Sequence, residues 1–144
     1  YPVRAIRTEK FLYIHNFAPD RYPSGNPETG YTNIDSSPTK SLILELNEQG
    51  NDKYYNYVMA KRGKEELYRV DQDSECIHNL ANNPEYAGIK TKLWNQLSSQ
   101  LKATNEPRMG NDPDLFDKYE YVGKERAKHS WEAYEKKTFK KQSY

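Results

Sequence analysis

Alternating apolar and polar residues near the start of the chain predict two neighbouring β-strands. Residues 2–8 and 10–16 are rich in β-forming residues, and Glu9-Lys10 lies between them at the spacing of a tight hairpin. The second run carries bulky side chains on both faces, so we expect the sheet to be covered on both sides. The two sets are Phe11, Tyr13 and His15 on one face and Leu12 and Ile14 on the other.

A period of three to four residues predicts the main helix, at about residues 84–102. Asn83-Pro84-Glu85 is a strong helix start. The apolar positions that follow lie on one face of a helix. They are Tyr86, Ile89, Leu93, Leu97 and Leu101. With a third strand at 66–70, the pattern predicts an α+β fold, in which this C-terminal helix packs across one face of a small antiparallel sheet.

Two short helices and several long loops complete the predicted domain. Ser37-Pro38 begins a helix that Gly50 ends, and Asp52 can cap a second helix that runs through Ala60. The expected packing face of this second helix is formed by Tyr54, Tyr55, Val58 and Met59. The loop at 17–37 is rich in Pro, Gly, Asn and Asp. It is either a functional loop, which faces substrate or forms an interface, or an insertion that has no role. We assign residues 1–123 to one subdomain. Residues 124–144 are assigned to a charged C-terminal tail that could be helical.

Composition excludes several functional classes. The 144 residues suffice for one domain with its own core, and the single cysteine excludes an internal disulfide. No apolar run approaches the ~20 residues that span a bilayer. Lys and Arg number 22 against 21 for Asp and Glu, so the formal net charge is only +1. The overall charge therefore does not favour binding to nucleic acid or to an anionic membrane. The thirteen tyrosines and two tryptophans suit a small domain docked on a larger body.

Two segments resemble the C-terminal subdomain of formylglycine-dependent sulfatases, which belong to the alkaline phosphatase superfamily. Residues 65–81 resemble the signature ELYDL..DP.E..NLA, although Arg69 and Ser74 stand where Asp and Pro are usual. Residues 1–16 resemble the pair of strands YPMRSVRT..FKLIHN, most closely in the heparan N-sulfatase (sulfamidase) branch. Both segments lie in the order and at about the spacing of that family.

The resemblance implies that the catalytic apparatus lies outside this chain. Sulfatases use a formylglycine made from the Cys or Ser of a C/S-x-P-x-R motif, in an N-terminal α/β domain that also holds calcium. Cys76 is followed by Ile-His-Asn-Leu, and the segment from Ser36 to Lys40 has lysine in place of the motif's arginine. We therefore expect no catalytic residue, metal ligand or cofactor in this chain.

The implied partners are the N-terminal catalytic domain of the same polypeptide and a sulfated saccharide. The parent enzyme would hydrolyse sulfate from sugars of the glycosaminoglycan type, and heparan N-sulfate is the most specific substrate that the resemblance implies. Its compartment would be periplasmic, secreted or lysosomal. The isolated chain would be inactive and would tend to self-associate, because a sheet face or strand edge would lie uncovered.

Three residues are candidates for the edge of the substrate pocket. Arg4 and Arg7 lie three apart on an extended segment and point to opposite faces, so they cannot form one sulfate clamp. Arg4 is the first candidate, because a guanidinium binds sulfate and carboxylate through a planar fork. His15 ends a strand, where it is either a packed structural residue or a substrate contact. None of the three histidines shows metal-site spacing.

A second functional class stays open at this point. The chain could be an autonomous module that binds polyanions or proteins and has no enzymatic parent, with its basic run at 136–141 as one possible contact. The residues that precede Tyr1 would separate the two classes. The order of the motifs across residues 1–102 favours the sulfatase subdomain.

Overall fold

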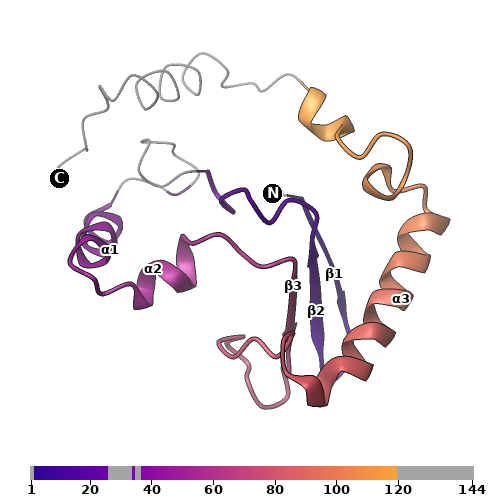
Figure 1. Cartoon of the computed structure of the whole chain (residues 1–144), viewed down its shortest axis with the longest axis horizontal. Helices are drawn as coiled ribbons and strands as arrows, with labels where there is room; N and C mark the ends of the chain where they lie inside the picture. Colours follow the sequence, from indigo (N-terminus) through magenta and orange to yellow (C-terminus); the bar gives the residue numbers. More distant parts are fainter. Residues whose placement is uncertain (1, 26–33, 35–36, 120–144) are drawn as a thin grey trace. The chain divides into compact units, whose positions relative to one another are not determined.

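The computed structural model describes residues 2–25, 34 and 37–119, which divide into two compact units (Figure 1). One unit contains Pro2–Pro19 and Arg62–Tyr119, and the other lies within Asp20–Lys61. The proposed tail at 124–144 and the residue Ser36 lie outside the described residues. The elements are β1 (Val3–Arg7), β2 (Leu12–Asn16), α1 (Pro38–Glu48), α2 (Lys53–Val58), β3 (Glu65–Tyr68) and α3 (Ala87–Ala103), with 3-10 turns at Pro84–Tyr86, Pro107–Met109 and Leu115–Lys118.

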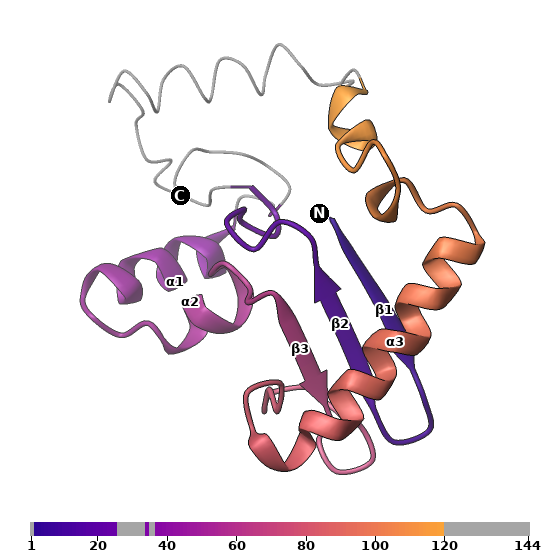
Figure 2. The same ribbon diagram turned by 45° about the vertical axis from the view of Figure 1, so that its right-hand side comes forward.

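The predicted α+β architecture is confirmed. The three strands form an antiparallel sheet in the order β1-β2-β3, and α3 lies along one side of it (Figures 1 and 2). The turn between β1 and β2 is closed by Thr8, whose backbone N–H donates to the Phe11 carbonyl at 2.8 Å. The Thr8 hydroxyl also accepts from the Phe11 N–H at 3.0 Å, which fixes the hairpin register.

The core of this unit lies between the sheet and α3. Ile6, Tyr13 and Leu67 are register partners, so their side chains form one buried row across the three strands. Leu93 and Leu97 cover this row from α3, as the helical period predicted. Ile89, from the same predicted stripe, is 37% exposed at the N-terminal part of the helix.

Two asparagines hold the ends of the strands. Asn16 is 1% exposed, and its amide nitrogen donates to the carbonyls of Arg62 and Gly63 just before β3. The Asn79 carbonyl oxygen accepts from the backbone N–H of Leu67 in β3 and from that of Ala81, each at 3.0 Å. Side-chain amides thus satisfy backbone groups that a three-stranded sheet leaves unpaired.

The second unit contains α1 and α2. Ser37 caps α1 through its hydroxyl, which accepts from the Lys40 N–H at 3.1 Å, and Gly50 follows the helix with φ +86°, as its predicted stop. The prediction for α2 was less accurate, because Asp52 makes no side-chain cap. Of the four residues expected on its packing face, Met59 is 2% exposed and Tyr55 is half-buried, whereas Tyr54 and Val58 are 51% and 48% exposed. Among the described residues, no helix is long and apolar enough to cross a membrane.

Candidate functional site

His15 lies at the centre of an aromatic and polar cluster on the face of the sheet that α3 covers. Its ring stacks on Trp94 of α3, with centroids 4.1 Å apart and planes inclined by 23°. The Phe17 ring makes an edge-on contact with His15, at 4.7 Å between ring centroids. The side chain is almost entirely buried. This packing fixes the orientation of the ring, and the substrate contact considered from the sequence stays a prediction.

A chain of polar contacts connects His15 to the first turn of α3. His15 Nδ1 lies 3.3 Å from the Tyr13 hydroxyl, which donates to Glu65 Oε1 at 2.7 Å. The other carboxylate oxygen of Glu65 forms an ion pair with Lys90 Nζ at 3.0 Å. Four side chains from two strands and a helix therefore form one continuous network.

The network shifts the proton affinities of its members. Burial lowers the pKa of His15, the nearby Lys64 ammonium lowers it further, and the Glu65 carboxylate only partly offsets both. Burial by itself would raise the pKa of Glu65, but hydrogen bonds from Tyr13 and Lys90 hold it below the ordinary value. The pKa of Tyr13 is raised by burial and by its bond to Glu65. The stable state is thus a neutral imidazole beside an ionised carboxylate.

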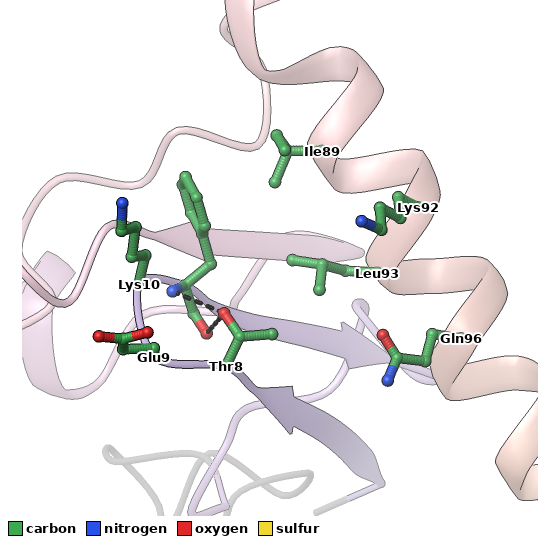
Figure 3. Close-up of a pocket in the computed structure, with 8 residues that line it drawn as sticks. Thr8, Glu9, Lys10, Ile89, Lys92, Leu93 and Gln96 are labelled. Carbon is green, nitrogen blue, oxygen red and sulfur yellow. Dashed lines mark hydrogen bonds between the residues drawn. The ribbon is translucent and has the colours of Figure 1, made fainter.

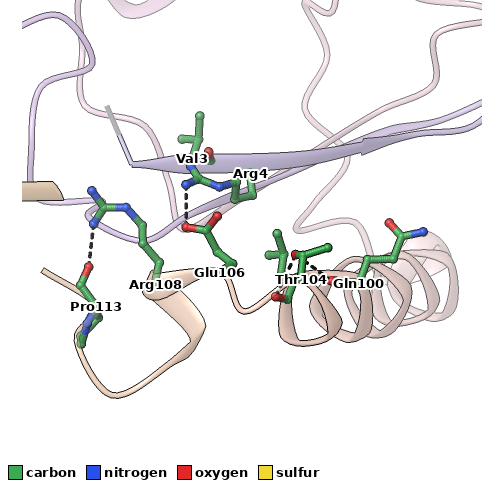
Figure 4. A network of polar contacts seen from close by, with 8 residues as sticks. Val3, Arg4, Gln100, Thr104, Glu106, Arg108 and Pro113 are labelled. Carbon is green, nitrogen blue, oxygen red and sulfur yellow. Dashed lines mark hydrogen bonds and ion pairs between the residues drawn. The ribbon is translucent and has the colours of Figure 1, made fainter. Parts of the chain in front are cut away.

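Arg4 lies on the same face of the sheet, in the row of His15 and Glu65. Its guanidinium pairs with Glu106 Oε1 at 2.6 Å and donates to the Val3 carbonyl at 2.8 Å (Figure 4). The guanidinium carbon also lies 5.9 Å from the centre of the Phe116 ring. Both terminal nitrogens of the guanidinium therefore make a hydrogen bond within the chain.

Arg7 lies apart from the other two candidates. The register pairs it with Leu12, on the opposite face from Arg4 and His15, and its side chain is exposed. The structure thus brings Arg4 and His15 to one face of the sheet and leaves Arg7 on the other. Whether any of the three borders a substrate pocket stays a prediction.

The described residues do not fit a formylglycine or calcium site. Cys76 sits at φ +54° in the loop after β3, and burial raises the pKa of its thiol. Within residues 2–25, 34 and 37–119, no group of three or more His, Cys, Asp or Glu side chains is placed to hold a metal ion.

A hollow of about 270 Å³ opens between the β1–β2 turn and α3 (Figure 3). Its apolar part is formed by Phe11, Ile89 and Leu93, and its polar part by Thr8, Glu9, Lys10, Lys92 and Gln96. Figure 3 shows Lys10 and Lys92 on opposite sides, with Leu93 between them. No pattern in the sequence predicted this hollow, because it depends on how the hairpin meets the helix.

The chain resembles proteins of one kind across most of its length. It is 30% identical over 122 residues to an ulvan-active sulfatase of Formosa agariphila, which covers 81% of this chain and 19% of that protein. A second ulvan-active sulfatase of the same organism is 31% identical over 106 residues, or 74% of this chain and 18% of that protein. An uncharacterised protein of Haemophilus influenzae is 33% identical over 55 residues, 38% of this chain and 28% of that protein. No family model matches, and the chain spans about a fifth of the length of the two sulfatases.

Proposed function

We propose that this chain, a sulfatase-related segment, is the C-terminal subdomain of an enzyme that hydrolyses sulfate from sulfated sugars. The observation that carries the proposal is the similarity to two ulvan-active sulfatases over 81% and 74% of the chain. The segment would complete the fold of the enzyme and border its substrate pocket, without a nucleophile of its own.

The proposed substrate is a sulfated polysaccharide. The resemblance of residues 1–16 to the heparan N-sulfatase branch supports a glycosaminoglycan with N-sulfate groups. The names of the two relatives support ulvan as the other polymer to test. An assay that offers both polymers side by side distinguishes the two substrates directly.

The proposed partner is an N-terminal catalytic domain in the same polypeptide, which would carry the formylglycine and the calcium ion. Metal-assisted electrostatic stabilisation of the transferring sulfuryl group would be the task of that domain. Arg4 and His15 are proposed to act at the pocket edge by positioning. Both are held by contacts within the chain, Arg4 by Glu106 and His15 by Trp94. Exposed Arg7 is the third candidate, for the opposite face of the sheet.

The sequence of the coding region upstream of Tyr1 tests the parentage. We expect several hundred residues that contain a C/S-x-P-x-R motif. A start codon and a signal peptide directly before Tyr1 would instead support the autonomous binding module.

The polypeptide that contains this motif should then be assayed for sulfate release from ulvan, heparan sulfate and N-sulfoglucosamine. Replacing the motif's Cys or Ser by Ala is the matched control, because it removes the nucleophile and leaves the subdomain intact. Release of sulfate that survives this replacement would contradict the proposed mechanism.

A further inference from the structure

The hollow between the β1–β2 turn and α3 has the composition of a ligand site. Small-molecule sites combine an apolar floor with a few polar groups at the rim. Here Phe11, Ile89 and Leu93 supply the apolar part, and the polar rim comes from two separate elements. Phe11 is held in place by an edge-on contact with Tyr86, at 6.2 Å between ring centroids.

The rim offers cationic and amide groups that no other described residue binds. Among the described residues, Lys10, Lys92 and Gln96 make no hydrogen bond or ion pair through their side chains, and all three are exposed. Lys90, two residues before Lys92, differs because it is paired with Glu65. The Thr8 hydroxyl is also occupied, by the backbone of Phe11. The available groups are therefore two ammonium ions and one amide.

We propose that this hollow binds a sulfated saccharide. Lys10 and Lys92 would each contact a sulfate group, Gln96 would bond a sugar hydroxyl, and the Phe11 ring would contact a sugar face. Two ammonium groups on opposite sides of an apolar floor match a ligand with anionic groups on an apolar ring. The choice of a sulfated ligand rests on the proposed function.

The charge of Glu9 allows a test of whether the ligand of the hollow is anionic. Its carboxylate also lines the hollow, where it repels an anion and partly cancels the two lysines. Removing this charge should strengthen binding of a sulfated ligand, whereas removing a lysine charge should weaken it. A site for a cationic or neutral ligand would show the opposite response or none.

The test is titration of the full chain with a heparin-derived tetrasaccharide, followed by backbone amide NMR and calorimetry. We expect shifts in the hairpin turn and in the first half of α3. The Kd should rise about fivefold for Lys10→Gln and for Lys92→Gln, and more for the double variant. Glu9→Gln should lower the Kd, and added salt should raise it. The matched control is Lys102→Gln, an exposed lysine on the same helix outside the hollow.

Several outcomes would overturn the inference. They are absence of binding, equal affinity for the desulfated tetrasaccharide, and an equal loss for Lys102→Gln, which would indicate nonspecific attraction. Failure of the proposed function is distinguished by a separate assay of the longer polypeptide. If the hollow binds the tetrasaccharide but the longer polypeptide shows no sulfatase activity, only the proposed function is contradicted. If the polypeptide is active but the hollow does not bind, only the saccharide site is contradicted.

Discussion

His15 stacks face to face on Trp94, at 4.1 Å between ring centroids, and this contact joins β2 to α3 at the polar end of the core. An indole plane packs equally well on a phenyl ring, but imidazole adds a group that takes up a proton near neutral pH. The contact therefore makes the stability of the sheet and helix depend on pH.

His15→Phe should remove a pH dependence that the unaltered chain shows. The pKa of His15 is lowered from 6.5 on folding, so below pH 6.5 the unfolded chain binds a proton that the folded chain excludes. Stability is full above pH 6.5 and falls as the pH drops toward the folded pKa. Phenylalanine keeps a ring on Trp94 and cannot titrate. Urea unfolding at a series of pH values measures the slope, and His78→Gln, at the surface, should keep it.

Leu93→Ala should destabilise the chain by about 2–5 kcal/mol, because it opens a cavity against Ile6, Tyr13 and Leu67. Leu93 is 4% exposed in the middle of this cluster. Thr91→Ala, at an exposed position of the same helix, should change stability by less than about 0.5 kcal/mol. Equal effects of the two variants on the urea midpoint would contradict the packing of α3 on the sheet.

The Arg4–Glu106 pair should show a measurable coupling energy. The side chains are 29% and 14% exposed, and the two charges lie 2.6 Å apart, so solvent screens them only in part. A double-mutant cycle with Arg4→Gln and Glu106→Gln should give about 1–2 kcal/mol. A coupling near zero would mean that Arg4 is available to a ligand, and would strengthen its role at a pocket edge.

The chain alone should release no sulfate from an aryl sulfate or from N-sulfoglucosamine, with or without calcium. It lacks the C/S-x-P-x-R motif, and positioning residues cannot replace a missing nucleophile. The released sulfate is measured by ion chromatography and compared with a buffer blank. Turnover that disappears in Ser36→Ala would show that the motif-like segment at Ser36 is active after all.

The sequence predicted the elements of the fold better than the contacts between them. Residue periodicity was enough for the strands and for α3, because Tyr13, Leu93 and Leu97 are buried by the regular geometry of a strand and a helix. The helix start differs only in detail, since Pro84–Tyr86 forms a 3-10 turn before α3 begins at Ala87.

The contacts of the candidate site depend on tertiary placement. Trp94 falls outside the predicted stripe of α3, and it becomes the partner of His15 only because the helix crosses the sheet at that point. Arg4 and Glu106 are 102 positions apart, so no local pattern could pair them. The packing face of α2 was predicted only in part, with Met59 buried and Tyr54 exposed, because a six-residue helix gives too few positions to establish a period.

Asn79 blocks the outer edge of β3. Both backbone groups of Leu67 are taken at the outer edge of β3, the N–H by the Asn79 carbonyl oxygen and the carbonyl by the Leu80 N–H at 2.7 Å. A foreign strand that approaches β3 must displace these bonds, so this edge of the sheet is a poor template for strand addition. The residues that follow β3 thus protect the sheet from edge-to-edge aggregation along that strand.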